Sequence, residues 1–215
     1  MKNIYEKFGI IIENEDLLRV ALTHSSYAYE HNTDCYERLE FLGDAALEIV
    51  CSDYLFSKTD KPEGVMSRLR SLYVCENALF EYSKEINLSK YILIGNGIEE
   101  PNKTIIADVF EATMAVIYLE KGLEGVKKVF NGLIVPYIER EEDFLMDYKS
   151  LLQEEVQTVR QSVTYNLVNE SGPAHHKTFE VEVVIDGFVF GKGIGFTKKE
   201  AEQNAAKEAY LKRAR

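Results

Sequence analysis

The chain has 215 residues, of which 46% are hydrophobic and 28% are charged, and its formal net charge is −11. This length suits one large domain or two smaller ones. No window holds the roughly 18 uninterrupted apolar residues that a bilayer-spanning helix needs. The N-terminus lacks the apolar segment of a signal peptide, and the three cysteines have no paired spacing. Composition therefore favours a cytoplasmic protein with free thiols and no membrane partner.

The charge is unevenly distributed. Residues 146–215 carry ten basic and ten acidic residues, so the whole acidic excess lies in residues 1–145. Such acidity argues against a nucleic-acid partner, unless the carboxylates gather where metal ions bind. The difference between the two parts predicts two domains, 1–145 and 146–215.

Residues 5–142 have apolar residues spaced mostly three and four apart, which predicts an all-α first domain. We expect Thr33 and Asp34 to cap a helix that begins near Glu37. The turn at residues 61–64 predicts a second helix that runs on through Leu79.

The helix that begins near Glu37 has an unusual acidic stripe. At about 100° per residue, four carboxylates lie on one side of it: Glu37, Glu40, Asp44 and Glu48. The expected core face lies opposite: Leu39, Leu42, Ala46, Ile49 and Val50. An acidic face exposed to solvent usually mixes both signs, and this stripe contains no basic residue. Because like charges at this spacing repel, a bound hard cation explains the stripe better.

A second group of carboxylates lies in residues 104–119, a run that is apolar on nearly every side and predicts a buried helix. Its only charged residues are Asp108 and Glu111. Burying an unpaired carboxylate costs several kcal/mol, on the order of 3–5, so this pair needs a cation or protons. One alternative is a salt bridge to Arg68 or Arg70. The other is a Mg²⁺ site shared with the acidic stripe, made by Glu40, Asp44, Asp108 and Glu111.

The last seventy residues predict an α-β-β-β-α unit. Residues 147–157 form an amphipathic helix, and residues 164–168, 178–185 and 188–195 alternate as strands do. Asp186-Gly187 predicts a hairpin turn, and Thr197 caps the final helix. The glycine-rich residues 191–195 lack the spacing of a phosphate loop and favour a bulge or a tight strand end.

The segment Glu-Arg-Leu-Glu-Phe-Leu-Gly-Asp-Ala-Ala-Leu at residues 37–47 resembles the signature of the ribonuclease III family. Three further segments occur in the order typical of this family: Thr-His-Ser-Ser-Tyr at residues 23–27, Glu63-Gly64, and residues 107–112. The resemblance therefore covers residues 1–145. It implies that Glu40, Asp44, Asp108 and Glu111 are metal ligands, of which Asp44 and Glu111 are catalytic. Glu37 and Glu63 become auxiliary acids near RNA, and Phe41 becomes a dimer contact.

The resemblance further implies a homodimeric endoribonuclease that hydrolyses double-stranded RNA. Its ions are Mg²⁺, with Mn²⁺ as a substitute, and it needs no small-molecule cofactor. The expected products carry 5′-phosphate and 3′-hydroxyl ends with two-nucleotide 3′ overhangs, and the expected substrates are rRNA and mRNA precursors. His24 is a candidate general base, although a single histidine on a helix is more often structural.

The second domain resembles a double-stranded-RNA-binding domain, through Gly172, Pro173 and the Lys198-Lys199 pair among other positions. Such domains contact two minor grooves and the phosphates between them. The resemblance implies these RNA contacts: Gln153, Glu154, His175, Lys198 and Lys199.

Two other functions remain as alternatives. A binding protein with this fold but without cleavage would normally lack one of the carboxylates, and all four are present. An acidic helical interaction domain leaves Asp108 and Glu111 unexplained. The sequence therefore favours the enzyme.

Overall fold

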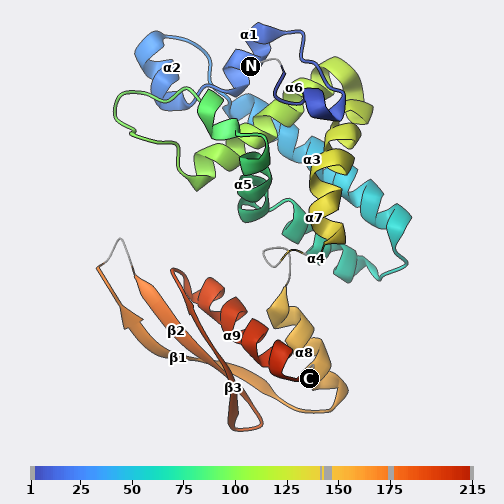
Figure 1. The fold of residues 1–215 in the computed structure, drawn as a ribbon, viewed down its shortest axis with the longest axis vertical. Helices are drawn as coiled ribbons and strands as arrows, with labels where there is room; N and C mark the ends of the chain where they lie inside the picture. The colour runs from blue at the N-terminus through green and yellow to red at the C-terminus, as the bar shows by residue number, and fades with distance from the viewer. Residues whose placement is uncertain (1–2, 141, 143–146, 174–176, 214–215) are drawn as a thin grey trace. The chain divides into compact units, whose positions relative to one another are not determined.

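The computed structural model describes residues 3–140, 142, 147–173 and 177–213. The chain divides into two compact units, Met1–Met146 and Asp147–Arg215, which Figure 1 shows in blue to yellow and in orange to red. Each unit is described by itself below.

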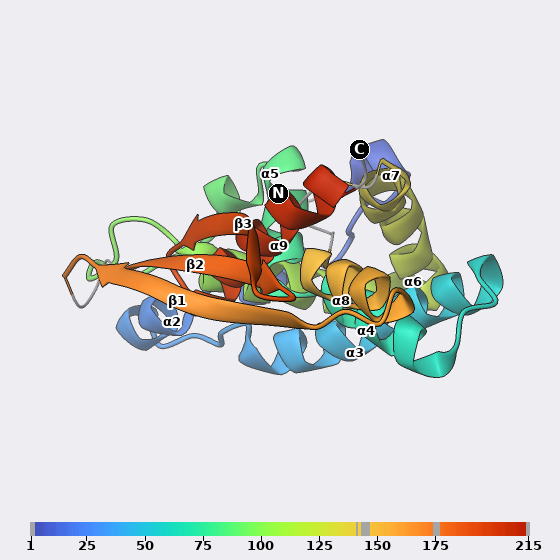
Figure 2. The ribbon, with the colours of Figure 1, turned by 90° about the horizontal axis from the view of Figure 1, so that it is seen from below.

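The first unit is helical. In its described residues the α-helices are α1 (Glu15–Ala21), α2 (Ser25–His31), α3 (Glu37–Lys58), α4 (Glu63–Tyr73), α5 (Glu76–Glu85), α6 (Lys103–Val129) and α7 (Val135–Glu139). Short 3-10 turns occupy Glu6–Phe8 and Leu88–Tyr91, and a π-helical turn occupies Phe130–Ile134. Helix α6 is the centre of the core, and its Phe110, Met114 and Ile117 are fully buried. Helices α3 and α5 both pack against α6 (Figures 1 and 2).

The structure corrects three details of the expected helices. Helix α3 has Tyr36 as its N-cap, and no side chain caps it, so the expected cap at residues 33 and 34 is wrong. The helix expected to run from residue 64 through Leu79 ends at Tyr73, and α5 begins anew at Glu76. The side chain of Ile49, expected in the core, is 51% exposed.

The second unit has the expected α-β-β-β-α order: α8 (Tyr148–Thr158), β1 (Val163–Ser171), β2 (Thr178–Ile185), β3 (Phe188–Gly195) and α9 (Lys198–Arg213). The three strands form an antiparallel sheet in sequence order. Helix α9 packs on β2 and β3, and α8 packs beside α9 (Figures 1 and 2). Asp186 and Gly187 both have positive φ in the turn between β2 and β3, as a two-residue hairpin requires.

Glycines on β3 allow α9 to lie close to the sheet. A methyl group added at Gly193 would lie 2.2 Å from the Ala201 carbonyl oxygen and 2.2 Å from the Ala205 nitrogen. Gly191 and Gly195 face the same helix with similar clearances. The register shift in β3 falls between the pairs made by Val189 and Gly191. These glycines therefore mainly allow helix α9 to lie close to β3. The register shift between β2 and β3 lies next to Gly191, at the start of the glycine-rich residues.

None of the helices in the described part of the chain has the length and hydropathy needed to cross a bilayer.

Candidate metal and RNA-binding site

Helices α3 and α6 lie close together at Gly43. A methyl group built at this position would lie 1.8 Å from the carbonyl oxygen of Glu111 and 3.2 Å from the nitrogen of Ala115. Only glycine permits this approach, because both obstacles are backbone atoms of α6. The crossing places Asp44, the next residue on α3, beside the turn of α6 that carries Glu111. Gly43 is a functional position that the sequence analysis did not single out, although a small residue beside the acidic stripe was a signal.

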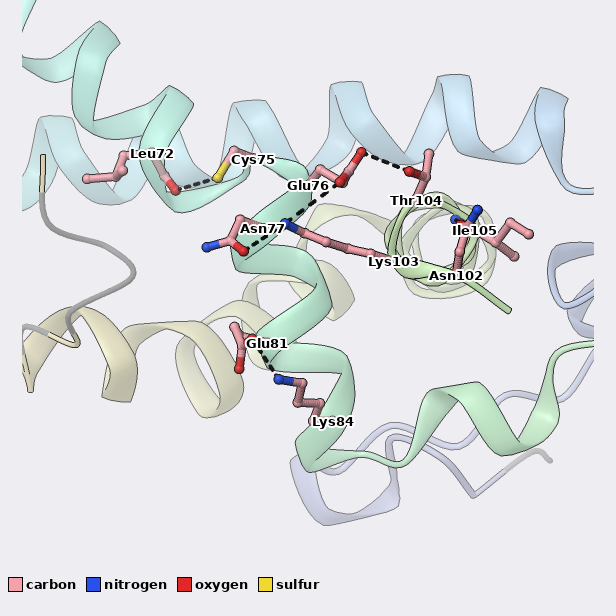
Figure 3. Close-up of polar contacts among 10 residues, drawn as sticks. All are labelled: Leu72, Cys75, Glu76, Asn77, Glu81, Lys84, Asn102, Lys103, Thr104 and Ile105. Atoms are coloured by element: carbon pink, nitrogen blue, oxygen red, sulfur yellow. Dashed lines mark hydrogen bonds and ion pairs between the residues drawn. The ribbon is translucent and has the colours of Figure 1, made fainter. Parts of the chain in front are cut away.

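The first turn of α6 is attached to α5 by polar contacts (Figure 3). The Lys103 ammonium donates to Asn77 Oδ1 at 2.8 Å and lies 3.8 Å from Glu76 Oε1. The Thr104 hydroxyl donates to Glu76 Oε2 at 3.1 Å. Asn102 caps the helix by accepting a hydrogen bond from the Ile105 nitrogen at 2.9 Å. These contacts fix the part of α6 that immediately precedes Asp108.

Three of the four predicted ligands, Glu40, Asp108 and Glu111, have a raised pKa, and neighbouring carboxylates contribute to each shift. Burial, together with the charges of Asp44 and Glu40, raises the pKa of Glu111 to about 8. Burial also raises the pKa of Glu40, and the charge of Asp108 adds to this effect. The pKa of Asp108 is raised chiefly by burial, which the hydrogen bond donated by Tyr36 partly offsets. The structure thus brings both carboxylate groups of the sequence prediction into one electrostatic cluster.

This carboxylate cluster (Glu40, Asp44, Asp108 and Glu111) fits a hard divalent cation chemically. All of its potential ligands are carboxylate oxygens, the donors that Mg²⁺ prefers. As placed, no three His, Cys, Asp or Glu side chains of the described residues form a complete metal site. Without a cation the carboxylates repel one another, so binding would require their side chains to rotate inward while the helices stay in place.

The other predicted acids lie differently. Glu37 is exposed on the first turn of α3, and its charge contributes to the raised pKa of Glu40. Glu63 is exposed at the start of α4, where its carboxylate accepts a hydrogen bond from Ser67 Oγ at 2.8 Å. Glu37 therefore adjoins the carboxylate cluster, whereas Glu63 lies on a separate helix.

Arg70 and His24, two other residues considered for the site, have contacts that indicate structural roles. The Arg70 guanidinium donates to Ser52 Oγ at 3.1 Å and lies 4.0 Å from Glu48 Oε1, so its polar contacts are with α3. His24 caps α2, because its Nδ1 accepts a hydrogen bond from the Ser26 nitrogen. This bond gives His24 a structural role.

Exposed apolar side chains follow one side of α3. Phe41 is 82% exposed, and Ile49 and Phe56 also reach solvent. At about 100° per residue these three positions fall within roughly 80° of one another. Ile49 and Phe56 line a groove of about 440 Å³ between α3 and α4, together with Met66. Ile49 is therefore exposed at this groove and is not packed into the core of the first unit.

Comparisons with known proteins match this arrangement. Residues 14–138 match the family model described as ribonuclease-III-like, and residues 148–213 match the double-stranded RNA binding motif. The protein is 43% identical to ribonuclease 3 of Streptococcus thermophilus, over 97% of this chain and 95% of that protein. It is 43% identical to ribonuclease 3 of Listeria innocua over the same shares of both chains. The chain belongs to the ribonuclease III family.

A solved structure supports the same assignment for the first unit. The nuclease domain of ribonuclease III from Campylobacter jejuni is 33% identical, with a TM-score of 0.58, and covers 62% of this chain and 94% of that one. That structure is described as showing structural flexibility in the region involved in dimer formation. The family assignment therefore rests on sequence over nearly the full length and on structure over the helical unit.

In this ribonuclease III family member, the second unit presents most of its predicted RNA contacts at the surface. Gln153 and Glu154 are exposed on α8, opposite the buried Leu152 and Val156. Lys198 and Lys199 are exposed on the first turn of α9, whose Thr197 cap accepts from the Glu200 nitrogen at 3.1 Å. His175 lies outside the described residues. The start of α9 thus combines two ammonium groups with the positive end of a helix dipole.

Proposed function

We propose that this protein hydrolyses phosphodiester bonds in double-stranded RNA with divalent metal ions held by Glu40, Asp44, Asp108 and Glu111. As a family member with both a nuclease unit and an RNA-binding unit, it is a double-strand-specific endoribonuclease. The observation that carries the metal assignment is the half-buried Glu111 carboxyl. Its pKa is raised to about 8 by burial and by neighbouring carboxylates, and a cation would relieve this repulsion.

The chemistry requires only positioned oxygens from the protein. Divalent ions held by these four carboxylates would activate a water and stabilise the leaving oxygen of an in-line displacement at phosphorus. The charge of Asp44 on α3 contributes to the raised pKa of Glu111 on α6, and these are the two ligands from which we expect the largest effect on rate. We include 5′-phosphate and 3′-hydroxyl products with two-nucleotide 3′ overhangs in the proposal, with Mg²⁺ as the ion and Mn²⁺ as a substitute.

The second unit holds the duplex. Lys198 and Lys199 contact phosphates, and Gln153 and Glu154 reach 2′-hydroxyl groups, which distinguish RNA from DNA. We include His175 as a further contact on the resemblance of its segment, and Glu37 and Glu63 as acids near the RNA. rRNA and mRNA precursors are the substrates we propose. The cysteines at 35, 51 and 75 are free thiols, which suits a reducing cytoplasm.

The test of the activity is cleavage of a labelled RNA duplex of about two helical turns, some 22 bp, comparable to the ~16 bp that such a domain spans. We expect the wild type to cut in Mg²⁺ and not in EDTA. Glu111→Gln should bind the duplex and fail to cut it. Binding by both proteins with cutting by neither would favour the alternative function, an RNA-binding protein that keeps the fold and lacks cleavage.

We also propose a homodimer that uses the apolar stripe of α3 (Phe41, Ile49 and Phe56). Two-fold symmetry places the same stripe of both copies in one interface, which would cover the 82% exposed Phe41. Phe41→Ser should lower the mass measured by light scattering from dimer to monomer. Tyr29→Ser removes an aromatic ring that is 92% exposed on α2 and should leave the mass unchanged. A wild-type monomer at micromolar concentration would refute the dimer.

A further inference from the structure

Tyr36 is a buried residue that contacts the carboxylate cluster. Its side chain is 5% exposed, and its hydroxyl donates a hydrogen bond to Asp108 Oδ2 at 3.1 Å. The two residues are 72 positions apart in the chain, so this bond joins the N-cap of α3 to the second turn of α6. Neither the acidic motif nor the family resemblance assigned a role to Tyr36.

The backbone of Tyr36 is anchored on both sides. Its nitrogen donates to the Thr23 carbonyl at 3.0 Å, and its own carbonyl accepts from the nitrogens of Leu39 and Glu40 at 2.8 and 2.9 Å. Tyr36, the N-cap of α3, is therefore bonded to the first turn of this helix, the turn that carries Glu40. A shift of this tyrosine would move a ligand on α3 and a ligand on α6 together.

The phenol ring is also supported from the side. The ring of His24 lies 5.8 Å from the ring of Tyr36, centroid to centroid. His24 is itself held in place by Ser26, whose hydroxyl lies 2.8 Å from its Nδ1. With the ring fixed in this way, the hydroxyl can occupy few positions, and one of them contacts Asp108.

We propose that Tyr36 is a positioning residue that orients the Asp108 carboxylate for metal binding. The hydroxyl occupies Oδ2 and leaves Oδ1 available to an ion, in the way that outer hydrogen bonds commonly orient metal ligands. It also holds Asp108 in place while the cluster contains no cation. This inference rests on the proposed function, because it assumes that the carboxylate cluster binds the catalytic ions.

The test compares Tyr36→Phe with Tyr82→Phe. Each substitution removes one phenol hydroxyl and keeps the ring; the Tyr82 hydroxyl donates to the Tyr73 carbonyl at 3.1 Å, in the same unit but outside the carboxylate cluster. Mg²⁺ binding is measured by calorimetry and by the rise of Tm with Mg²⁺ concentration, and cleavage is measured over the same titration. Losing an outer hydrogen bond to a metal ligand typically weakens binding about 10–100-fold.

We expect Tyr36→Phe to raise the Mg²⁺ midpoints of binding and cleavage by about that factor, and Tyr82→Phe to lower Tm without moving either midpoint. Asp108→Ala completes a double-mutant cycle, in which removing the Tyr36 hydroxyl should have no further effect once the carboxylate that accepts its hydrogen bond is gone. Equal midpoints for the wild type and Tyr36→Phe would overturn the positioning role alone. A wild type that neither binds Mg²⁺ nor cleaves would overturn the proposed function as well.

Discussion

Replacing Glu111 with Gln should stabilise the metal-free protein at alkaline pH. Burial and neighbouring carboxylates raise the pKa of Glu111 from 4.5 to about 8, so the folded state binds this proton more tightly than the unfolded state does. The carboxyl group therefore makes folding less favourable as pH rises from 4.5, and the penalty is complete above about 8. An amide of similar shape carries no such penalty.

The size of the effect follows from the same values. Each pKa unit corresponds to about 1.4 kcal/mol, which gives an upper limit of about 5 kcal/mol for the Glu111 carboxyl at pH 8.5. The side chain is only partly buried, and solvent and salt screen its interactions with neighbouring charges. We therefore expect a stabilisation of about 1–2 kcal/mol for Glu111→Gln. For a unit of this size, that free energy corresponds to a rise of about 2–8 °C in Tm.

The assay is thermal unfolding in EDTA at several pH values between 5 and 8.5. The Tm difference between Glu111→Gln and the wild type should be small at pH 5 and grow with pH. Glu124→Gln is a control in the same unit, because Glu124 lies beyond the kink of α6 at Gly122, where its carboxylate is 3.5 Å from the Lys127 ammonium and outside the carboxylate cluster. A Tm difference that does not depend on pH, or a Gln variant that is less stable at pH 8.5, would refute the electrostatic argument.

Three further predictions concern the frame of each unit and the RNA contact. Gly43→Ala should reduce cleavage by about 100-fold, since an error of 1 Å in ligand position has an effect of this order, and should lower Tm in unfolding experiments. Gly193→Ala should destabilise the second unit by about 1–3 kcal/mol through overpacking. The control is Gly187→Asn in the β2–β3 turn, which should have a smaller effect. An unchanged Tm for Gly193→Ala would contradict the close approach of α9 at this residue. The double substitution Lys198→Ala, Lys199→Ala should weaken RNA binding in filter-binding titrations. It should also reduce the magnitude of the slope of log K against log salt by about 2, because each lost phosphate contact releases roughly one counterion fewer. An unchanged slope would show that neither lysine contacts a phosphate.

Elements defined by local pattern were well predicted from the sequence. The buried run around Asp108 and Glu111 forms the central helix α6, because an all-round apolar helix can only lie inside. Strands β2 and β3 begin and end where alternation and the Asp186-Gly187 turn placed them. In these segments the side-chain periodicity and the turn residues agree, so tertiary contacts only reinforce the local preference.

Features that depend on distant contacts were not predicted. Helix α3 begins at Glu37 as predicted, but its N-cap is Tyr36, whose nitrogen donates to the Thr23 carbonyl, and not one of the capping side chains at residues 33 and 34. Ile49 has the spacing of a core residue, but it lies toward the groove between α3 and α4. The need for glycine at position 43 arises from the backbone of α6, which the sequence of α3 alone does not reveal. Periodicity describes one helix at a time and contains no information about its neighbours.

The carboxylate cluster and its frame should respond to mutation in opposite ways. The cluster residues repel one another, so removing one charge relaxes the metal-free fold while it removes a metal ligand. The frame residues are Gly43 and Tyr36, which hold α3 against α6 through a close backbone approach and a hydrogen bond, and Lys103, which bonds α6 to Asn77 of α5. Changing them lowers both stability and metal affinity. A residue whose replacement raises Tm but lowers Mg²⁺ affinity therefore belongs to the cluster, and one whose replacement lowers both belongs to the frame.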